Sequence, residues 1–164
     1  MEKDKSIKEL DEWLEKSQDD DFPELNNEQI SSRNILDDLV NINLDSHSTF
    51  KIDFSYKRNG VQDSILMKLK RLDCHKITSE IDLHGYDVKT ALIKLNTFIN
   101  YAYKSEIKYI KVICGKGINS KDGIPKLNIL TQEYIKKSKI INAACVSREA
   151  DGGYGVIKVL LKSY

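Results

Sequence analysis

The second half of the chain alternates short β-branched runs with amphipathic stretches, and this order constrains the fold more than any other feature. The runs at 79–85, 109–114, 140–146 and 156–161 have the composition of strands. Between the first three runs, apolar residues recur at three- and four-residue spacings, which predicts two helices. The order β-α-β-α-β-β predicts an α/β fold, a two-layer sandwich in which helices cover a mixed sheet.

Each of the two predicted helices has a start signal and one apolar face. Asp87 can cap the first helix through its carboxylate. The second helix extends from about Pro125 to Lys137, since proline is tolerated in a first turn. The residues expected to face the core are Val88, Ala91, Leu92, Leu95, Phe98, Ile99 and Ala102 in the first helix, and Leu127, Leu130, Tyr134 and Ile135 in the second.

The segment IDLHG at 81–85 carries the first candidate functional group. Asp82 and His84 are two residues apart on an extended segment, so their side chains point to the same side. An imidazole exchanges protons near neutral pH, and a neighbouring carboxylate can orient it. Asp82 and His84 are therefore a candidate acid–base pair. The structural alternative is that both side chains only hydrogen-bond a neighbouring loop.

Two further glycine-containing segments follow, CGKG at 114–117 and GGYG at 152–155. Lys116 lies between Gly115 and Gly117, where the backbone can approach a phosphate closely and the lysine adds a positive charge. GGYG predicts a tight turn into the last strand. Neither segment has the spacing of a phosphate-gripping NTPase loop or of a dinucleotide fingerprint, so a nucleotide site of either kind is not predicted.

In this order, IDLHG, CGKG and GGYG resemble the hallmarks of the small MutS-related (Smr) domain family. The resemblance covers about residues 70–163. It implies an Smr domain at 79–164, nucleic-acid binding and endonuclease activity. We expect RNA as the substrate, with His84 as general base or acid, Asp82 as its partner and Lys116 stabilising phosphate charge. DNA, whose cleavage requires an activated water, is the alternative substrate.

The expected nucleic-acid interface consists of loops around these segments. Because loops carry the site, and not a groove-entering helix, a single-stranded or distorted substrate is favoured. Tyr86 is a candidate to stack on an unpaired base. The residues expected to bind nucleic acid are Gly85, Tyr86, Gly115, Lys116, Gly117, Lys121, Lys126, Arg148 and Gly153.

Two positions depart from the family's usual pattern. Cys114 stands where the family usually has His or Thr, and Asn128 stands where a basic residue is common. A nucleic-acid- or ribosome-binding module without catalysis is therefore the second hypothesis, and Lys126 or Lys121 can supply the missing charge. We expect Cys114 to be a small apolar residue that ends a buried strand, because reactivity would require an unusual pKa.

No metal site or cofactor is expected. One Asp and one His make an incomplete ligand set, although magnesium held mainly by the substrate is an alternative. His47 and His75 have no comparable setting and are expected on the surface. The three cysteines are odd in number and widely spaced, which argues against a disulfide framework and a zinc site.

The net charge of +1 conceals a division along the chain. Residues 1–50 contain 5 Lys and Arg against 14 Asp and Glu, and the remainder contains 21 against 11. A basic remainder favours a polyanion as partner, and a solvated lysine-rich surface is an equally open alternative. No apolar run approaches the roughly 20 residues that span a bilayer, and the first residues lack a secretory signal. We expect a cytoplasmic protein with no membrane partner.

The first 45 residues predict an acidic, partly disordered extension. It begins with a short amphipathic helix at 6–16 and continues as an acidic linker. The helix can dock on a protein partner, fold back over the basic surface as an inhibitor, or only solubilise the chain. Segment 46–78 is expected to connect this extension to the domain, with an extended stretch at 50–56 and a helix at 61–72.

Overall fold

The structure is a computed structural model, and it describes residues 50–118 and 123–163. The predicted helix at 6–16, the acidic linker, His47 and Lys121 lie outside the described residues. The strands are β1 (Ser55–Lys57), β2 (Glu80–Asp82), β3 (Tyr109–Ile113), β4 (Ile141–Val146) and β5 (Val156–Leu161). The helices are α3 (Asp63–Arg71), α4 (Val88–Lys104) and α5 (Lys126–Lys137), with short 3-10 helices η2 (Cys74–Lys76), η3 (Glu149–Asp151) and η4 (Gly153–Gly155).

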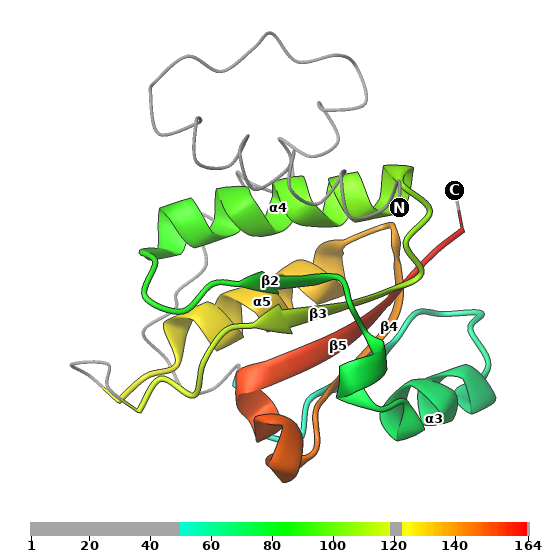
Figure 1. Cartoon of the computed structure of the whole chain (residues 1–164), viewed down its shortest axis with the longest axis horizontal. Helices are drawn as coiled ribbons and strands as arrows, with labels where there is room; N and C mark the ends of the chain where they lie inside the picture. The colour runs from blue at the N-terminus through cyan, green and yellow to red at the C-terminus, as the bar shows by residue number, and fades with distance from the viewer. Residues whose placement is uncertain (1–49, 119–122, 164) are drawn as a thin grey trace, which may run out of the picture. The chain divides into compact units, whose positions relative to one another are not determined.

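The five strands form one mixed sheet in the order β1-β4-β5-β3-β2 (Figure 1). β2 and β3 are parallel, and the other neighbours are antiparallel. The predicted α/β fold with the order β-α-β-α-β-β is confirmed from β2 onward. Because β2 and β3 run parallel, both end at the same edge of the sheet, and β5 begins there opposite Ile113. This topology brings the three glycine-containing segments to one end of the sheet.

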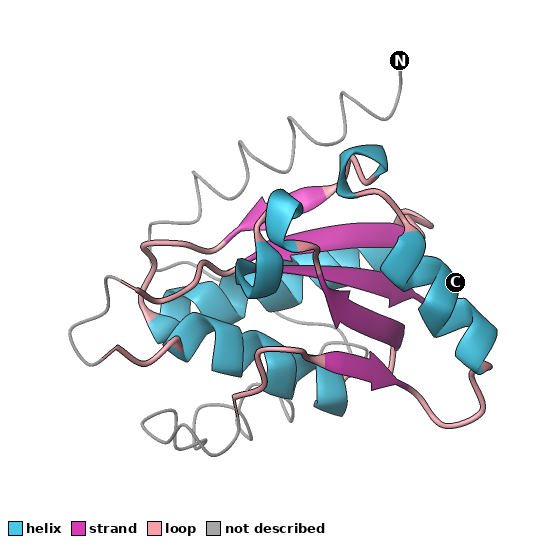
Figure 2. Cartoon of the chain, turned by 90° about the horizontal axis from the view of Figure 1, so that it is seen from below, coloured by secondary structure: helices cyan, strands magenta, loops and turns pink. Residues whose placement is uncertain are grey.

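Helices α4 and α5 lie side by side along one face of the sheet (Figures 1 and 2). Asp87 caps α4 as predicted, because its carboxylate accepts hydrogen bonds from the backbone N–H groups of Lys89 and Thr90 at 3.0 and 3.1 Å. The expected apolar stripe of α4 is buried from Ala91 to Ala102, while Val88 is partly exposed. Each fully buried leucine or phenylalanine in such a stripe contributes about 1.5–3 kcal/mol.

Segment 46–78, expected as a connection, supplies β1 and α3 to the fold. The stretch at 50–56 was expected to be extended, but only Ser55 and Tyr56 belong to β1, and residues 52–53 form a turn. β1 pairs with β4 at the edge opposite β2. α3 packs through Leu69 on the face of the sheet that carries Ala143, Cys145 and Leu160. Residues that alternate with these along the strands point to the opposite face, where α4 and α5 lie. The sheet is therefore covered on both faces near β4 and β5.

A buried lysine fixes the end of α3 to the sheet. Lys158 of β5 is 2% exposed, and its ammonium donates to the backbone carbonyls of Lys70 and Leu72 at 2.9 and 2.8 Å. The last carbonyls of a helix lack helical partners and carry partial negative charge, so a lysine is favourable there. None of the helices in residues 50–118 and 123–163 is long and apolar enough to cross a membrane.

Candidate active site

The three glycine-containing segments contact one another at the edge of the sheet where β2 and β3 end. The backbone N–H groups of Cys114 and Gly115 both donate to the carbonyl of Gly155, at 2.9 and 3.1 Å. A Cβ on Gly115 would lie 3.8 Å from the Cβ of His84, and a Cβ on Gly155 would lie 3.2 Å from the carbonyl carbon of Gly115. Gly115 is therefore in contact with both other segments, and side chains from all three share one end of the sheet.

Asp82 and His84 form a direct pair. His84 Nδ1 lies 2.6 Å from Asp82 Oδ1, and the same oxygen accepts the backbone N–H of His84 at 3.0 Å. Both side chains are open to solvent, with 45% of Asp82 and 72% of His84 exposed. Ile81 and Leu83 are buried on the other side, as the strand alternation predicts. A carboxylate on Nδ1 holds the tautomer in which Nε2 can accept a proton.

An aromatic ring follows this pair directly. Gly85 has a φ of +81°, a conformation that favours glycine, and turns the chain after β2. Tyr86 is 43% exposed, and the ammonium of Lys94 lies 4.8 Å from the centroid of its ring. A partly exposed ring with a lysine over it offers both a stacking surface and a positive charge beside His84.

Lys116 is paired with a residue that the sequence analysis did not identify. Its ammonium lies 3.1 Å from Glu149 Oε2 and 5.4 Å from the centroid of the Tyr154 ring. A Cβ on Gly153 would lie 2.7 Å from Glu149 Oε1, so this glycine leaves room for the carboxylate. The sequence signal for Glu149 was weak, because it is one acidic residue shortly before GGYG and nothing in the spacing links it to Lys116.

Three other expected nucleic-acid contacts have different surroundings. Gly117 has a φ of +67°, and a Cβ there would lie 2.6 Å from Cα of Pro125, so this glycine allows close packing at the start of α5. Lys126 is the first residue of α5 and is partly exposed. Arg148 points toward carboxylates: its Nε lies 2.8 Å from Asp151 and its terminal nitrogen 3.6 Å from Asp73.

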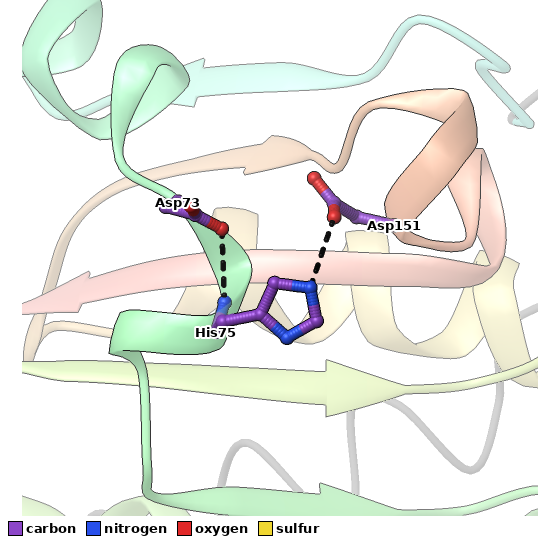
Figure 3. Close-up of side chains that lie close together, drawn as sticks. All are labelled: Asp73, His75 and Asp151. Atoms are coloured by element: carbon purple, nitrogen blue, oxygen red, sulfur yellow. Dashed lines mark hydrogen bonds and ion pairs between the residues drawn. The ribbon is translucent and has the colours of Figure 1, made fainter.

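Arg148 pairs with Asp73 and Asp151. Asp73, His75 and Asp151 lie close together in a second group of polar side chains (Figure 3). His75 is 87% exposed, as expected of a surface residue, and its Nε2 is 3.9 Å from Asp151. The hydrogen bond that Arg148 donates to Asp151, and then the charges of Asp151 and Asp73, raise the pKa of Arg148. The backbone N–H of His75, followed by the charge of Arg148, lowers the pKa of Asp73.

Within the described residues, one His and two Asp of this group lie close enough together to hold a metal ion. Arg148 already pairs with both carboxylates, and its positive charge opposes the entry of a cation. Asp73 lies directly before η2, and Asp151 is the last residue of η3. The arrangement therefore links these two short helices through an ion-pair network.

The two positions that depart from the family pattern are both buried. Cys114 is 4% exposed, its thiol donates to the carbonyl of Gly155 at 3.6 Å, and burial raises its pKa to about 12. Cys114 thus lies buried directly after β3, as expected, and its raised pKa disfavours the reactive thiolate. Asn128 is 0% exposed; its amide donates to the carbonyl of Tyr154 and accepts a hydrogen bond from Gln132 at 2.8 Å.

One helical face was predicted wrongly in detail. Leu127 was expected to face the core, but it is only partly buried, and Asn128 lies inside. The reason is that the Asn128 amide has hydrogen-bonding partners on both sides, which offset the cost of burying a polar group. Asn128 thus connects α5 to the GGYG turn.

Comparisons with known proteins agree with this architecture. Residues 81–162 match the Smr domain family. The chain is 42% identical over 65 residues to Endonuclease NBR9 of Saccharomyces cerevisiae, covering 40% of this chain and 27% of that protein. It is 31% identical over 86 residues to Endonuclease MutS2 of Staphylococcus aureus, covering 52% of this chain and 11% of that protein. The chain thus spans less than a third of the length of these relatives.

Among solved structures, the fold is similar to that of YdaL, a stand-alone small MutS-related protein from Escherichia coli. The TM-score is 0.60 at 19% sequence identity, and the match covers 71% of this chain and 89% of that one. At this identity, the likeness concerns the arrangement of helices and strands. It extends beyond the residues that match the family, since 71% of the chain exceeds the span 81–162.

Proposed function

The chain belongs to the Smr domain family, and we propose that it is a nucleic-acid endonuclease that cleaves RNA. The observation that carries this proposal is the 2.6 Å contact between Asp82 and His84, exposed at the edge of the sheet beside Gly115. Relatives that are named endonucleases support the reaction class. The acid–base pair and the neighbouring lysine are the groups that phosphodiester cleavage requires.

In the proposed reaction, His84 Nε2 takes the proton of a ribose 2′-hydroxyl. The 2′-oxygen then attacks the adjacent phosphorus, and the bond to the 5′-oxygen of the next nucleotide breaks. That 5′-oxygen takes up a proton from water as it leaves, and His84 later returns the 2′-hydroxyl proton to solvent, so the products carry a 2′,3′-cyclic phosphate and a 5′-hydroxyl. Asp82 holds the imidazole through Nδ1 and stabilises its protonated form. Lys116 stabilises the negative charge that develops on the phosphate.

The substrate proposed for this site is single-stranded or distorted RNA. The chemistry needs a nucleotide whose 2′-oxygen can align with the phosphate, which a regular helix restricts. Tyr86 offers a ring on which an unpaired base can stack, and it follows His84 by two residues. A site on the ribosome, or a protein partner for the N-terminal segment, is a separate proposal that rests on the sequence of residues 1–45.

The test compares one labelled oligonucleotide in three forms: all RNA, all DNA, and RNA with a single 2′-deoxy nucleotide at the mapped cleavage position. We expect the full-chain protein to cut the RNA and to leave the other two forms intact at that position. Cleavage of the 2′-deoxy form at an unchanged rate would show that water is the nucleophile and would contradict the mechanism. The same reactions in EDTA should proceed at the same rate; a loss that magnesium restores would indicate a metal held by the substrate.

A binding module without catalysis is the second candidate, and the burial of Cys114 favours it. The side chain at the position where the family usually has His or Thr is 4% exposed, so it cannot contact a substrate without rearrangement. This candidate predicts nucleic-acid binding that weakens steeply with salt, and no product at any pH. Cleavage of RNA by purified protein that is lost in the His84→Ala variant would exclude it.

A further inference from the structure

Lys116, the lysine of the candidate site, forms an ion pair with Glu149. Lys116 Nζ lies 3.1 Å from Glu149 Oε2, and the two side chains are 35% and 78% exposed. If Lys116 binds a phosphate, as the proposed function requires, an anion is already present at that position. We propose that Glu149 acts as an internal competitor, which holds Lys116 in the free protein and must move away when RNA binds.

The GGYG turn is shaped around this ion pair. A Cβ on Gly153 would lie 2.7 and 2.8 Å from the two carboxylate oxygens of Glu149, so any other residue there would displace the carboxylate from this position. A Cβ on Gly155 would lie 3.1 Å from Cγ of Lys116, so this glycine makes room for the lysine side chain. Two glycines of the turn therefore lie against the two partners of the ion pair.

Lys116 of the CGKG segment brings a positive charge to this turn. The N–H of Gly153 donates to the carbonyl of Arg148 at 2.9 Å, and the N–H of Gly155 donates to that of Gly152 at 3.2 Å. These N–H groups stabilise the turn itself. Tyr154 helps to position the lysine, because its hydroxyl donates to the Lys116 carbonyl at 3.3 Å and its ring lies near the ammonium. The charge of Lys116 is thus shared between Glu149 and any incoming phosphate.

The competition should be moderate in size, because an exposed ion pair is easily broken. Removing the charge of Glu149 frees Lys116 and also removes a repulsion between the carboxylate and the phosphate. We expect Glu149→Gln to tighten the binding of a single-stranded RNA by roughly 3- to 10-fold at low salt. The slope of affinity against salt should become steeper by roughly 0.7, because a released Glu149 no longer takes up a cation on binding.

The experiment measures fluorescence anisotropy of a labelled single-stranded RNA with four forms of the full chain. These are the unchanged protein, Glu149→Gln, Lys116→Met and the Lys116→Met/Glu149→Gln double variant. A matched control is Asp63→Asn, which removes the partner of Lys57 in an exposed pair of 2.6 Å near β1, the edge strand opposite β2. It changes the net charge equally and frees a lysine elsewhere, so it should alter the affinity less than about twofold.

A second readout does not depend on RNA. Titration with inorganic phosphate, followed by NMR at the amides of Lys116 and Gly153, should give a larger response in Glu149→Gln than in the unchanged protein. If phosphate binding increases while neither form binds or cuts RNA, the competitor role of Glu149 stands and the proposed function fails.

Three results would overturn the inference. The first is that Glu149→Gln binds neither RNA nor phosphate more tightly than the unchanged protein. The second is that its gain in affinity persists in the double variant, since the effect would then not act through Lys116. The third is an equal gain in Asp63→Asn, which would reduce the effect to net charge. A gain in affinity that requires Lys116 and is absent from Asp63→Asn supports the competitor role of Glu149.

Discussion

The chain contains the pattern Asp-x-His three times, at 45–47, 73–75 and 82–84. The copy at 45–47 lies outside the described residues, and the two described copies, Asp82–His84 and Asp73–His75, have different structures. In both, the carboxylate accepts the backbone N–H of the histidine, at 3.0 and 3.2 Å. Only Asp82 also contacts the imidazole, at 2.6 Å. Asp73 instead faces Arg148 at 3.6 Å, and the ring of His75 is directed toward Asp151 (Figure 3).

The difference arises from the backbone that carries each copy and from the neighbouring cation. Asp82 ends a strand, where side chains two residues apart lie on the same side. Asp73 caps a short 3-10 helix, and its carboxylate is shared with a guanidinium. The spacing alone therefore does not create an acid–base pair. A carboxylate must be available to the imidazole, and this holds for Asp82.

The largest expected effect is the loss of cleavage when the first imidazole is removed. His84→Ala should lower the rate of RNA cleavage by about 10²- to 10⁴-fold, the usual contribution of a general base. His75→Ala, the matched change in the second copy, should leave the rate within about twofold. Gel analysis of a labelled RNA under single-turnover conditions measures both. Equal losses in the two variants would remove the functional distinction between the copies.

Exchange of the carboxylates should have the next largest effect. Asp82→Asn keeps the shape of the side chain but can donate to Nδ1, which favours the wrong tautomer of His84. We expect a rate lower by on the order of 10- to 100-fold. Asp73→Asn should leave cleavage unchanged. An Asp82→Asn protein with full activity would mean that the 2.6 Å contact has no part in catalysis.

Replacing the cation near each copy, Lys116 for the first and Arg148 for the second, should have different effects. Lys116→Met should weaken RNA binding by roughly 3- to 10-fold. Arg148 was expected from the sequence to contact nucleic acid, but we now expect Arg148→Met mainly to lower the Tm. The side chain of Asp151 is only 8% exposed, and without Arg148 its carboxylate would lose its closest cation. Thermal unfolding and anisotropy titrations distinguish the two roles; a large loss of affinity with unchanged Tm in Arg148→Met would restore the original expectation.

The smallest effect on cleavage is expected at Cys114. Burial raises the pKa of its thiol to about 12, so the neutral form persists in the folded protein near neutral pH. Cys114→Ala should change the cleavage rate less than about twofold and lower the free energy of unfolding by about 1 kcal/mol through the lost packing. Above about pH 9 the unfolded thiol ionises while the folded one does not, so this thiol's contribution to stability declines there. Loss of cleavage in Cys114→Ala would indicate a nucleophilic thiol.

Much of the fold could be predicted because its elements follow local rules. The last four strands, α4 and α5 were apparent from periodicity, and the N-cap Asp87 was apparent from its type and position. The roles of β1 and α3 could not be predicted, because they depend on pairing with β4 and on burial against Leu160, far away in the sequence. Local patterns do not encode such distant contacts.

The candidate site, like the fold, was predictable where the contacting residues are close in the sequence. Strand alternation was sufficient for Asp82 and His84, which are neighbours in the sequence. The pairing of Lys116 with Glu149 and of Arg148 with Asp73 joins residues from separate loops, and charge alone did not identify the partners. Asn128 illustrates the same limit, since its burial depends on the carbonyl of Tyr154.

The dependence of cleavage on pH tests the role of His84 most directly. The single-turnover rate should be measured from acid to mildly alkaline pH for the unchanged protein, His84→Ala and His75→Ala. A protonated imidazole cannot act as a base, so we expect the rate of the unchanged protein and of His75→Ala to fall as the pH is lowered. After subtraction of the cleavage that occurs without protein, the residual rate of His84→Ala should lack this fall. A profile of His84→Ala that keeps it, or a His75→Ala profile that loses it, would contradict the assignment of the acid–base role to Asp82 and His84.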